Sequence, residues 1–236
     1  MITIENIHKS FGKIRVLKGI DLDIPKGSAV AILGPNGSGK TTLMKSLLGM
    51  VVPDQGRILL NNTTIDRGWK YRNGIDYLPQ IANFPNNLKV SELLKMIKDI
   101  RGAKTDKETY YIDLFSLHPF LNKKLGTLSG GTKQKVNLVL AFMFDSPILI
   151  LDEPTSGLDP ISLLVLKDII LGEKKKGKTL LISSHIMNFV EKVCDTILFI
   201  WEGTIYFNGS ITDLKKNTKK DDFEHAIAHL LKSAHD

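Results

Sequence analysis

The sequence predicts an α/β protein whose core is a parallel sheet. Short apolar runs rich in branched residues, at 148–151, 179–182 and 196–200, have the composition of buried strands. Helical patterns separate these runs, and such an alternation builds a parallel sheet covered on both faces. The alternation of apolar and polar residues over 20–24 predicts an antiparallel sheet before the core, and a helical pattern over 85–145 predicts an inserted lobe.

Local spacing predicts the elements that precede this lobe. Ile20, Leu22 and Ile24 alternate with acidic residues, which is the period of a half-exposed strand, and residues 2–7 are expected to join the same antiparallel sheet. The remaining elements are a strand at 28–33, a helix marked by Leu43, Leu47 and Leu48, and short strands at 57–60 and 75–78.

Capping residues predict where two later helices begin. In the lobe, apolar residues recur at helical spacing from Val90 to Ile97, with Ser91 as the candidate N-cap. Asp159-Pro160 combines an N-cap with proline at the first helical position, which opens a helix to about residue 171. We expect a single domain over 1–236, with its core at 1–84 and 146–213, the helical lobe at 85–145 and a C-terminal tail at 214–236.

The charge of the chain is basic but unevenly spread. Lysine and arginine number 32 and the acidic residues 25, so the formal net charge is +7. Such a balance can suit nucleic acid or an anionic membrane surface. Much of the excess, however, lies in short clusters at 174–176 and 215–220, where solvated lysines are usual at helix ends and in tails. We therefore expect no nucleic-acid partner.

Cysteine and apolar content indicate the compartment. Cys194 is the only cysteine, which excludes an internal disulfide or a cysteine metal cage and fits a reducing cytosol. No apolar run reaches the roughly 18 residues that span a bilayer. Met1 leads directly into a strand-like segment without a signal-peptide pattern. The sequence therefore predicts a cytoplasmic protein.

The most informative stretch is a glycine-rich loop directly after the strand at 28–33. It fits the pattern G-x-x-x-x-G-K-[ST], in which a curled backbone points successive N–H groups at a phosphate. A helix begins inside the loop, and its N-terminal dipole favours an anion. Lys40 can reach the β and γ phosphates, and the Thr41 hydroxyl can ligate Mg²⁺. The predicted nucleotide-binding residues here are Gly34, Pro35, Asn36, Gly37, Ser38, Gly39, Lys40, Thr41 and Thr42.

A phosphate loop needs a second, acidic element for the metal, and Asp152-Glu153 supplies it. These carboxylates follow the apolar strand at 148–151, at the carboxyl edge where α/β folds bind ligands. Asp152 is predicted to hold Mg²⁺, and Glu153 to accept a proton from the attacking water or to orient it. The alternative is an acidic turn without function, which the neighbouring phosphate loop disfavours.

Further motifs stand in a characteristic order around these residues. They are Gln80 after Tyr77-Leu78-Pro79, Leu128-Ser129-Gly130-Gly131 ahead of a helix expected near Thr132, Pro154 to Asp159 after the carboxylates, and His185 at the end of a strand. In this order they resemble the ATP-binding cassette (ABC) ATPases, over about residues 2–212. The resemblance implies a P-loop NTPase fold with a RecA-like parallel-sheet core, an N-terminal antiparallel β subdomain and an inserted helical subdomain.

The resemblance implies roles for residues within one protomer. Phe11 stacks on adenine, to which it offers a flat apolar face. Gln80 approaches Mg²⁺ together with Thr41 and Asp152, and senses the γ-phosphate. His185 contacts the γ-phosphate and positions water. The implied cofactors are ATP and Mg²⁺, and the implied catalytic residues are Glu153, His185 and Gln80.

The resemblance also implies roles across a dimer of two copies. Ser129, Gly130 and Gly131 act on the nucleotide that the second ATPase subunit binds, through another anion-binding helix start. Asp159 lies where the two subunits touch and communicate. Thr132 follows these residues and is expected to contact the same nucleotide. The family commonly has glutamine at this position, so the finer geometry of the dimer interface stays open.

A single ATPase domain of this kind is similar to the motor subunit of a multi-subunit membrane transporter. Such a subunit binds transmembrane permease subunits and is peripheral on the inner face of the cell membrane. Phe84, Pro85 and Leu88 either contact a short helix of that partner or pack into the helical lobe. The basic charge leaves a soluble ABC protein that acts on ribosomes or DNA as the alternative. A GTPase is disfavoured, because this sequence has no Asn-Lys-x-Asp element to recognise guanine.

Two alternatives for the cargo remain open. The chain resembles the ATPase subunit of the transporter that serves copper-site maturation of nitrous oxide reductase. The similar segments are 79–85, 128–135, 137–145 and 223–227. The alternative is an exporter of drugs, lipids or peptides. Neither the direction of transport nor the membrane partners follow from the sequence.

A copper cargo draws attention to histidines in the tail. His225 and His229 are spaced so that both can reach one metal on a helix, and His235 is nearby. An ordinary amphipathic tail helix explains the same spacing, because Ala226, Ile227, Leu230 and Leu231 supply its apolar contacts. The helix without a metal is the expected arrangement.

Overall fold

The computed structural model describes residues 1–65 and 68–234. Its N-terminal part is a four-stranded antiparallel sheet in the order β2-β1-β4-β5. The strands are β1 (Ile2–Phe11), β2 (Ile14–Ile24), β4 (Gln55–Leu60) and β5 (Thr63–Thr64). The antiparallel sheet predicted from alternation is therefore confirmed, and its first strand is longer than the expected residues 2–7.

The core is a six-stranded sheet in the order β10-β9-β3-β8-β7-β6. Its neighbours are parallel, except that β10 pairs antiparallel with β9 at the edge. The strands are β3 (Ala29–Leu33), β6 (Ile75–Leu78), β7 (Ile148–Asp152), β8 (Thr179–Ser183), β9 (Thr196–Trp201) and β10 (Thr204–Ser210). The predicted buried strands are all present, because their branched apolar composition matches burial on both faces.

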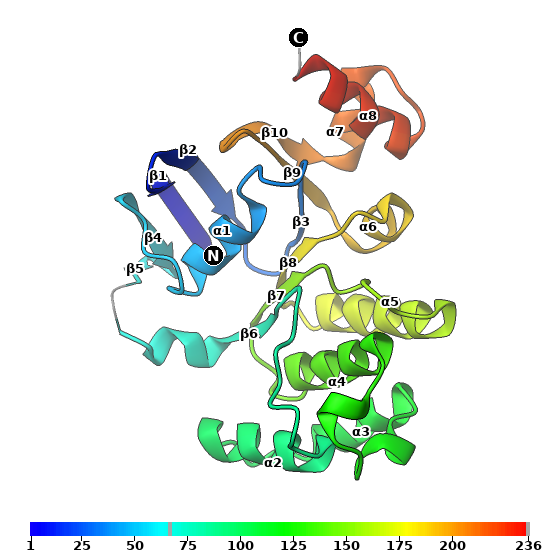
Figure 1. Ribbon diagram of the computed structural model, residues 1–236. Helices are drawn as coiled ribbons and strands as arrows, with labels where there is room; N and C mark the ends of the chain where they lie inside the picture. The colour runs from blue at the N-terminus through cyan, green and yellow to red at the C-terminus, as the bar shows by residue number, and fades with distance from the viewer. Residues whose placement is uncertain (66–67, 235–236) are drawn as a thin grey trace.

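Side chains of the core strands alternate between two hydrophobic clusters. Val30 and Ile32 face one cluster, whereas Ala31 and Leu33 face the other. On the first face, α1 (Lys40–Leu47) lies between the two sheets (Figure 1), and residues of the antiparallel sheet complete this cluster. The predicted cover by helices on both faces is thus only part of the arrangement, because a second sheet shares one of those faces.

The second face is covered by helices (Figure 1). The segment expected to form a helical lobe contains α2 (Val90–Arg101), α3 (Lys107–Leu114) and α4 (Gly130–Phe142). The later helices are α5 (Pro160–Lys175), α6 (Met187–Val193), α7 (Ile211–Thr218) and α8 (Phe223–Ser233), and short 3₁₀ turns are η1 (Lys70–Gly74), η2 (His118–Phe120) and η3 (Leu125–Thr127). Within the described residues, none of the helices has the length and apolar character that a membrane crossing requires.

The candidate N-cap at Ser91 is wrong. Helix α2 begins at Val90, and Lys89 occupies the cap position, where its N–H donates to the Glu92 carboxylate at 2.9 Å. The N–H of Ser91 donates instead to the backbone oxygen of Leu121 at 3.0 Å. A neighbouring segment therefore satisfies the first turn of the helix, and local sequence does not reveal such a partner.

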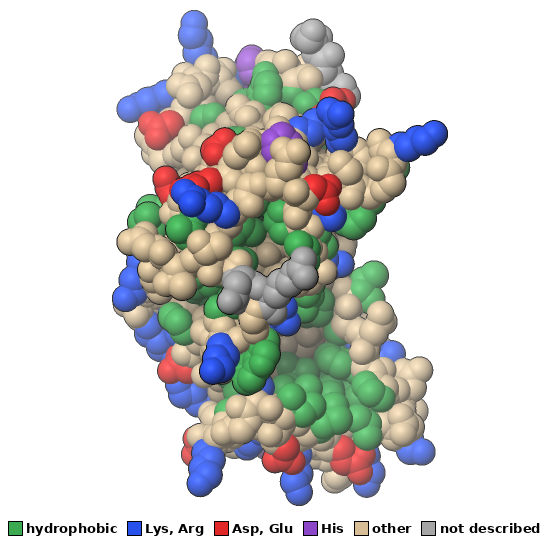
Figure 2. Space-filling view, turned by 90° about the vertical axis from the view of Figure 1, so that its left-hand side faces the viewer, with side chains coloured by type: hydrophobic (Ala, Val, Ile, Leu, Met, Phe, Trp, Pro, Cys, Tyr) green, Lys and Arg blue, Asp and Glu red, His purple; other side chains and the backbone are tan. Residues whose placement is uncertain are grey.

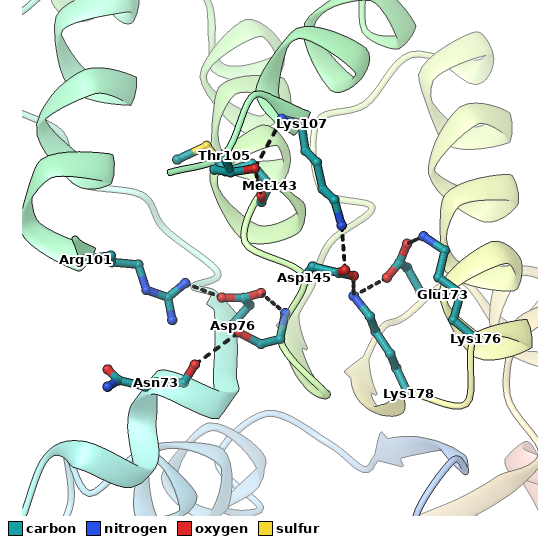
Figure 3. Close-up of polar contacts among 11 residues, drawn as sticks. Asn73, Asp76, Arg101, Thr105, Lys107, Met143, Asp145, Glu173, Lys176 and Lys178 are labelled. Atoms are coloured by element: carbon teal, nitrogen blue, oxygen red, sulfur yellow. Dashed lines mark hydrogen bonds and ion pairs between the residues drawn. The ribbon is translucent and has the colours of Figure 1, made fainter. Parts of the chain in front are cut away.

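Ion pairs connect the helical segment to the core (Figure 3). Arg101, at the end of α2, pairs with the buried Asp76 of β6. Asp145 forms ion pairs with Lys107, from α3, and with Lys178, and each ammonium nitrogen lies 2.5 Å from a carboxylate oxygen. Hydrogen bonds from these two lysines lower the pKa of Asp145 to about 2. The carboxylate therefore contributes to stability through its charged form.

We expect Asp145→Asn to destabilise the protein in a pH-dependent way. Because the folded pKa lies below the unfolded one, the contribution is complete above about pH 4 and is lost as pH falls toward 2. Allowing for solvent screening, the loss near pH 7 is of the order of 1 kcal/mol in the free energy of unfolding. Asn also tolerates the left-handed backbone of this position, φ 62°. Urea denaturation at pH 7 and pH 3 measures it, and an equal loss at both would contradict the assignment.

Candidate nucleotide-binding site

Four parallel strands of the core end at the same edge of the sheet, and each one carries a segment of predicted site residues. The phosphate loop follows β3, Gln80 follows β6, Asp152 ends β7, and His185 follows β8. These segments, distant in the sequence, meet in a pocket of about 430 Å³. It is lined by Phe11, Ile14, Val16, Asn36, Gly37, Gly39, Lys40, Thr41, Thr42, Gln80, Asp152, Glu153 and His185.

The glycines of the phosphate loop are required by space as well as by backbone conformation. Gly34 has φ 139°, and a Cβ there would lie 2.1 Å from the backbone oxygen of Ile200. The loop therefore passes directly against β9, and any larger residue at this position would displace it. Helix α1 starts at Lys40 with Gly39 at the cap position, so no side chain caps its first N–H groups, and its first three residues line the pocket.

In this structure Lys40 is bonded to its own loop. Its Nζ donates to the backbone oxygens of Gly34 and Pro35, at 2.8 and 2.9 Å. Burial lowers the pKa of Lys40, and the carboxylates of Glu153 and Asp152 oppose this shift. Among the residues that the structure describes, none forms a hydrogen bond with the buried hydroxyl of Ser38. Lys40 and Ser38 can therefore donate hydrogen bonds to phosphate oxygens, once the lysine leaves the two carbonyls.

The residues predicted to hold Mg²⁺ lie together. Asp152 is 2% exposed, and one of its oxygens accepts a hydrogen bond from Ser183 Oγ at 2.6 Å. The other accepts from Thr41 Oγ1 at 3.1 Å. This set of oxygens fits a hard cation that completes its shell with water and substrate phosphates. Within residues 1–65 and 68–234, no group of three His, Cys, Asp or Glu residues can hold a metal alone.

Glu153 sits in a constrained turn beside Asp152. Its backbone has φ 51°, which is uncommon for a residue with a side chain, and its N–H donates to Ser183 Oγ at 2.9 Å. Its Oε1 lies 3.2 Å from Nε2 of the largely exposed His185. Burial raises the pKa of Glu153 and outweighs the lowering by His185. A carboxylate of raised pKa is a better proton acceptor.

Gln80 and Phe11 line the outer part of the pocket. Gln80 is exposed just beyond the end of β6. Phe11, at the end of β1, is 50% exposed, and the ammonium of Lys9 lies 5.4 Å from its ring centroid. An exposed ring at a pocket is available to stack on a base. Ile14 and Val16 add apolar surface there; the sequence reasoning missed both, although their position just after Phe11 was a usable signal.

The segment around Ser129 lies outside this pocket. Helix α4 begins at Gly130, two residues earlier than expected from Thr132, because Ser129 caps it. Ser129 Oγ accepts the N–H of Thr132 at 3.3 Å and lies 2.8 Å from the Thr132 hydroxyl. A Cβ at Gly131 would lie 2.6 Å from the backbone oxygen of Gly157, so the helix start packs closely on the segment after Glu153.

Asp159 is bonded within its own chain. It caps α5 by accepting the Ser162 N–H at 2.8 Å, which confirms the predicted cap, and α5 runs four residues beyond the expected end at 171. Lys135 of α4 lies 2.7 Å from the same carboxylate, and this hydrogen-bonded ammonium holds the pKa of Asp159 well below its usual range.

His185 also differs slightly from expectation. Strand β8 ends at Ser183, and His185 lies in the loop before α6 rather than in the strand. This places the imidazole at the sheet edge, where the strand ladder no longer restrains it. The role of Ser183, which binds both Asp152 and the N–H of Glu153, was not predicted.

The tail forms the expected amphipathic helix α8. Ala226, Ile227 and Leu230 are buried. His225 Nδ1 pairs with Asp222 at 3.0 Å, and His229 Nδ1 lies 3.3 Å from Ser233 Oγ, so both histidines have local partners. His235 lies outside the described residues.

The geometry therefore defines an α/β ATPase of the P-loop class, and comparisons with known proteins identify its family. The profile of the ABC transporter family matches residues 17–156. The chain belongs to this family as an ATP-binding cassette, and its predicted ATPase class is confirmed.

Relatives and solved structures agree with this assignment. The lantibiotic transport ATP-binding protein SrtF of Streptococcus pyogenes is 35% identical over 208 residues, 87% of this chain and 89% of that protein. The L-cystine import ATP-binding protein TcyN of Bacillus subtilis is 33% identical over 94% of this chain and 90% of that protein. An ATP-binding subunit of an ABC transporter, 26% identical, superposes with a TM-score of 0.90 over 98% of this chain and 99% of its own. The predicted RecA-like P-loop fold is thereby confirmed.

Proposed function

We propose that this protein is the ATP-binding and ATP-hydrolysing subunit of a multi-subunit membrane transporter. The observation that carries the proposal is the pocket at the carboxyl edge of the core sheet. It gathers the phosphate loop, two carboxylates, a glutamine and a histidine from four strand ends. Such a set suits phosphoryl transfer to water, in which positioning and charge neutralisation supply most of the rate enhancement.

In this proposal each side chain has a defined task. The loop N–H groups and Lys40 hold the β and γ phosphates. Thr41 and Asp152, with Gln80 close by, would hold Mg²⁺, which neutralises negative charge developing on the phosphates. Glu153 takes a proton from the water that attacks the γ-phosphorus, while the bond from that phosphorus to the bridging oxygen breaks and ADP leaves. His185 contacts the γ-phosphate and orients the carboxylate of Glu153.

We further propose that a second copy of the chain completes each site. The residues that line the pocket of one chain do not include the Ser129 segment. Ser129 and Gly130 are exposed at the start of α4, where N–H groups can receive an anion. In a head-to-tail dimer, Ser129, Gly130, Gly131 and Thr132 of one copy reach the nucleotide of the other, with Asp159 at the contact. A related cassette, 25% identical with a TM-score of 0.79, has been solved as a dimer.

A mixing experiment tests this arrangement. Ser129→Asp retains a good N-cap but places a negative charge against the γ-phosphate, so we expect it to abolish ATPase activity without unfolding α4. Glu153→Gln alone is inactive for a different reason. Mixed before ATP is added, the two variants form dimers with one intact site, and about a quarter of wild-type activity returns if half of the dimers are mixed.

The matched control is Ser129→Asn, which caps the helix without a charge and should stay active. Activity of the mixture that merely equals the sum of the separate variants would contradict sharing of the site between copies. Coupled-enzyme detection of ADP measures all four samples.

We infer that the permease subunits bind the face of the helical lobe. Figure 2 shows hydrophobic side chains gathered on the lower part of this face, over the region of α2. Exposed apolar residues in this region include Ile100 of α2 at 72%, and Trp69 at 62% and Ile81 at 73% in neighbouring segments. Phe84 and Leu88 are half-buried against the lobe, whereas Pro85 is exposed. Through such partners the protein would be cytoplasmic and peripheral on the inner face of the membrane.

The cargo of this proposed transporter is a finer hypothesis. Copper-site maturation of nitrous oxide reductase is our hypothesis from the resemblance, and export of drugs, lipids or peptides is its alternative. Relatives whose names state lantibiotic transport, cystine import and Nod factor export all share the cassette, so similarity of the cassette does not select a cargo. Co-purification at physiological salt separates a permease partner from nucleic acid, and stimulation of ATPase activity in the purified complex by copper or by peptides then separates the cargoes.

A further inference from the structure

Helix α4 carries two buried amide side chains with no assigned role. Gln134 and Asn137 are 7% and 3% exposed and lie three residues apart, on one face of the helix. Neither lines the pocket. Each donates an amide N–H to a backbone carbonyl outside α4, and each of these carbonyls adjoins a residue of the proposed catalytic set.

Asn137 holds the segment that carries Gln80. Its Nδ2 donates to the backbone oxygen of Pro79 at 3.2 Å. The side chain of Gln80 itself has no hydrogen-bond or ion-pair partner in the part of the chain that the structure describes. Its position is therefore set by the backbone just before it, which leaves β6 and is bonded to α4 at this point.

Gln134 holds the turn that contains Glu153. Its Nε2 donates to the backbone oxygen of Pro154 at 3.1 Å and lies 3.5 Å from that of Glu153. The left-handed backbone of Glu153, φ 51°, persists only where surrounding contacts hold it. Ser183 Oγ accepts the Glu153 N–H from the side of β8. The turn is thus held between β8 on one side and α4 on the other.

The same helix begins at Ser129. Thirteen residues of α4 run without interruption from Gly130 to Phe142, so its first turn and its buried amides move as one body. A displacement of the Ser129 end is therefore carried to Pro79 and Pro154 by two hydrogen bonds. The Gln134 bond is buried and the Asn137 bond is partly buried. In such surroundings an unpaired amide or carbonyl is costly, so the bonded arrangement is favoured.

We propose that Gln134 and Asn137 are positioning residues that fix Glu153 and Gln80 to α4, so that binding of a partner's nucleotide by Ser129 aligns the hydrolytic residues of its own chain. The inference rests on the proposed function, because it takes Glu153 and Gln80 as residues that act on the nucleotide. It adds a physical connection between the two sites of the dimer: the helix that serves one nucleotide holds the residues that serve the other.

Gln134→Met and Asn137→Leu test the proposal, because each retains approximate volume and removes the donor. We expect kcat to fall about tenfold or more, since small misplacements of catalytic groups are costly, while KM for ATP changes by less than about twofold. In a Gln80→Ala background, Asn137→Leu should have little further effect on kcat, because the two changes act on one group. Asn137→Ser, which leaves space instead of an apolar group, should give the same pattern if Asn137→Leu folds poorly.

Thr105→Val is the matched control. It removes the hydrogen bond from Thr105 Oγ1 to the backbone oxygen of Met143 at 3.1 Å, away from the pocket. The same hydroxyl also accepts the Lys107 N–H at 3.2 Å, and this bond is lost as well. This variant should lose a comparable hydrogen bond without a change in kcat. Equal kcat in Asn137→Leu and Thr105→Val, or fully multiplicative effects of Asn137→Leu and Gln80→Ala, would overturn the positioning role.

Hydrogen–deuterium exchange gives a readout that needs no catalysis. In nucleotide-free protein, Asn137→Leu should speed exchange at residues 80–84, and Gln134→Met at residues 155–158, whereas Thr105→Val should change neither segment. Unchanged exchange at these segments overturns the inference even if the wild-type protein hydrolyses ATP. Faster exchange together with an inactive wild-type protein instead supports the structural connection and rejects the proposed function.

Discussion

Glu153→Gln is expected to lower the turnover of ATP by about a thousandfold, within the range for loss of a general base. Glutamine has nearly the same shape but accepts no proton. The carboxylate is suited to the role by its position, because it is buried beside Asp152, its pKa is raised by burial, and its Oε1 is 3.2 Å from His185 Nε2. The phosphate loop is untouched, so affinity for ATP should remain.

The same variant should accumulate an ATP-bound dimer if, as proposed, the dimer closes on ATP and is released by hydrolysis. Size-exclusion chromatography with and without ATP measures the dimer, and equilibrium binding of a labelled nucleotide measures affinity. Glu224→Gln, an exposed position on α8, is the matched control and should behave as wild type. Normal turnover of Glu153→Gln would show that another group accepts the proton.

Lys40→Ala is expected to lower the affinity for ATP by about a hundredfold, equivalent to about 2.7 kcal/mol. Hydrogen bonds to a charged group contribute roughly this much when the site excludes water. In the free protein the ammonium is bonded to the carbonyls of Gly34 and Pro35, so the phosphates must draw it away from these oxygens. The measured loss therefore reports the difference between the two arrangements of Lys40.

Two further variants separate the phosphate contact from other effects. Lys45→Ala removes an exposed lysine from the same helix and should leave ATP affinity unchanged. Lys40→Arg keeps the charge but replaces a compact ammonium with a planar, bulkier group, so we expect only partial recovery. Isothermal titration with ATP and Mg²⁺ compares the three variants. An affinity of Lys40→Ala close to that of wild type would mean that the loop N–H groups alone hold the phosphates.

The elements that were predictable are those whose cause is local. The glycine pattern from Gly34 to Lys40 specifies a curled loop by itself, and apolar strands of four to six residues are recognisable by composition. Asp152 and Glu153 follow such a strand directly, so the parallel order of the sheet brings them to the edge where the loop lies. The cap at Asp159 was predictable because its partner, Ser162, is only three residues away.

The features that escaped prediction depend on partners far along the chain. Ser91 has the residue type of a cap, but the N–H of Ser91 is bonded to Leu121. The cover of the first sheet face by α1 and a second sheet follows from packing of segments that are distant in sequence. Ser183 joins Asp152 to the Glu153 turn across two strands, a contact that exists only once β7 and β8 are in register.

Residue type and spacing along the chain were therefore enough to specify the phosphate cradle, the acidic pair and the class of ATPase, because each is encoded within a few consecutive residues. Folding alone settled how these pieces are held: Lys40 on the loop carbonyls, Glu153 in a strained turn, and α4 bonded to both Pro79 and Pro154. The physical reason is that a buried donor binds whichever acceptor the packed chain brings within about 3 Å, and sequence separation does not limit that choice.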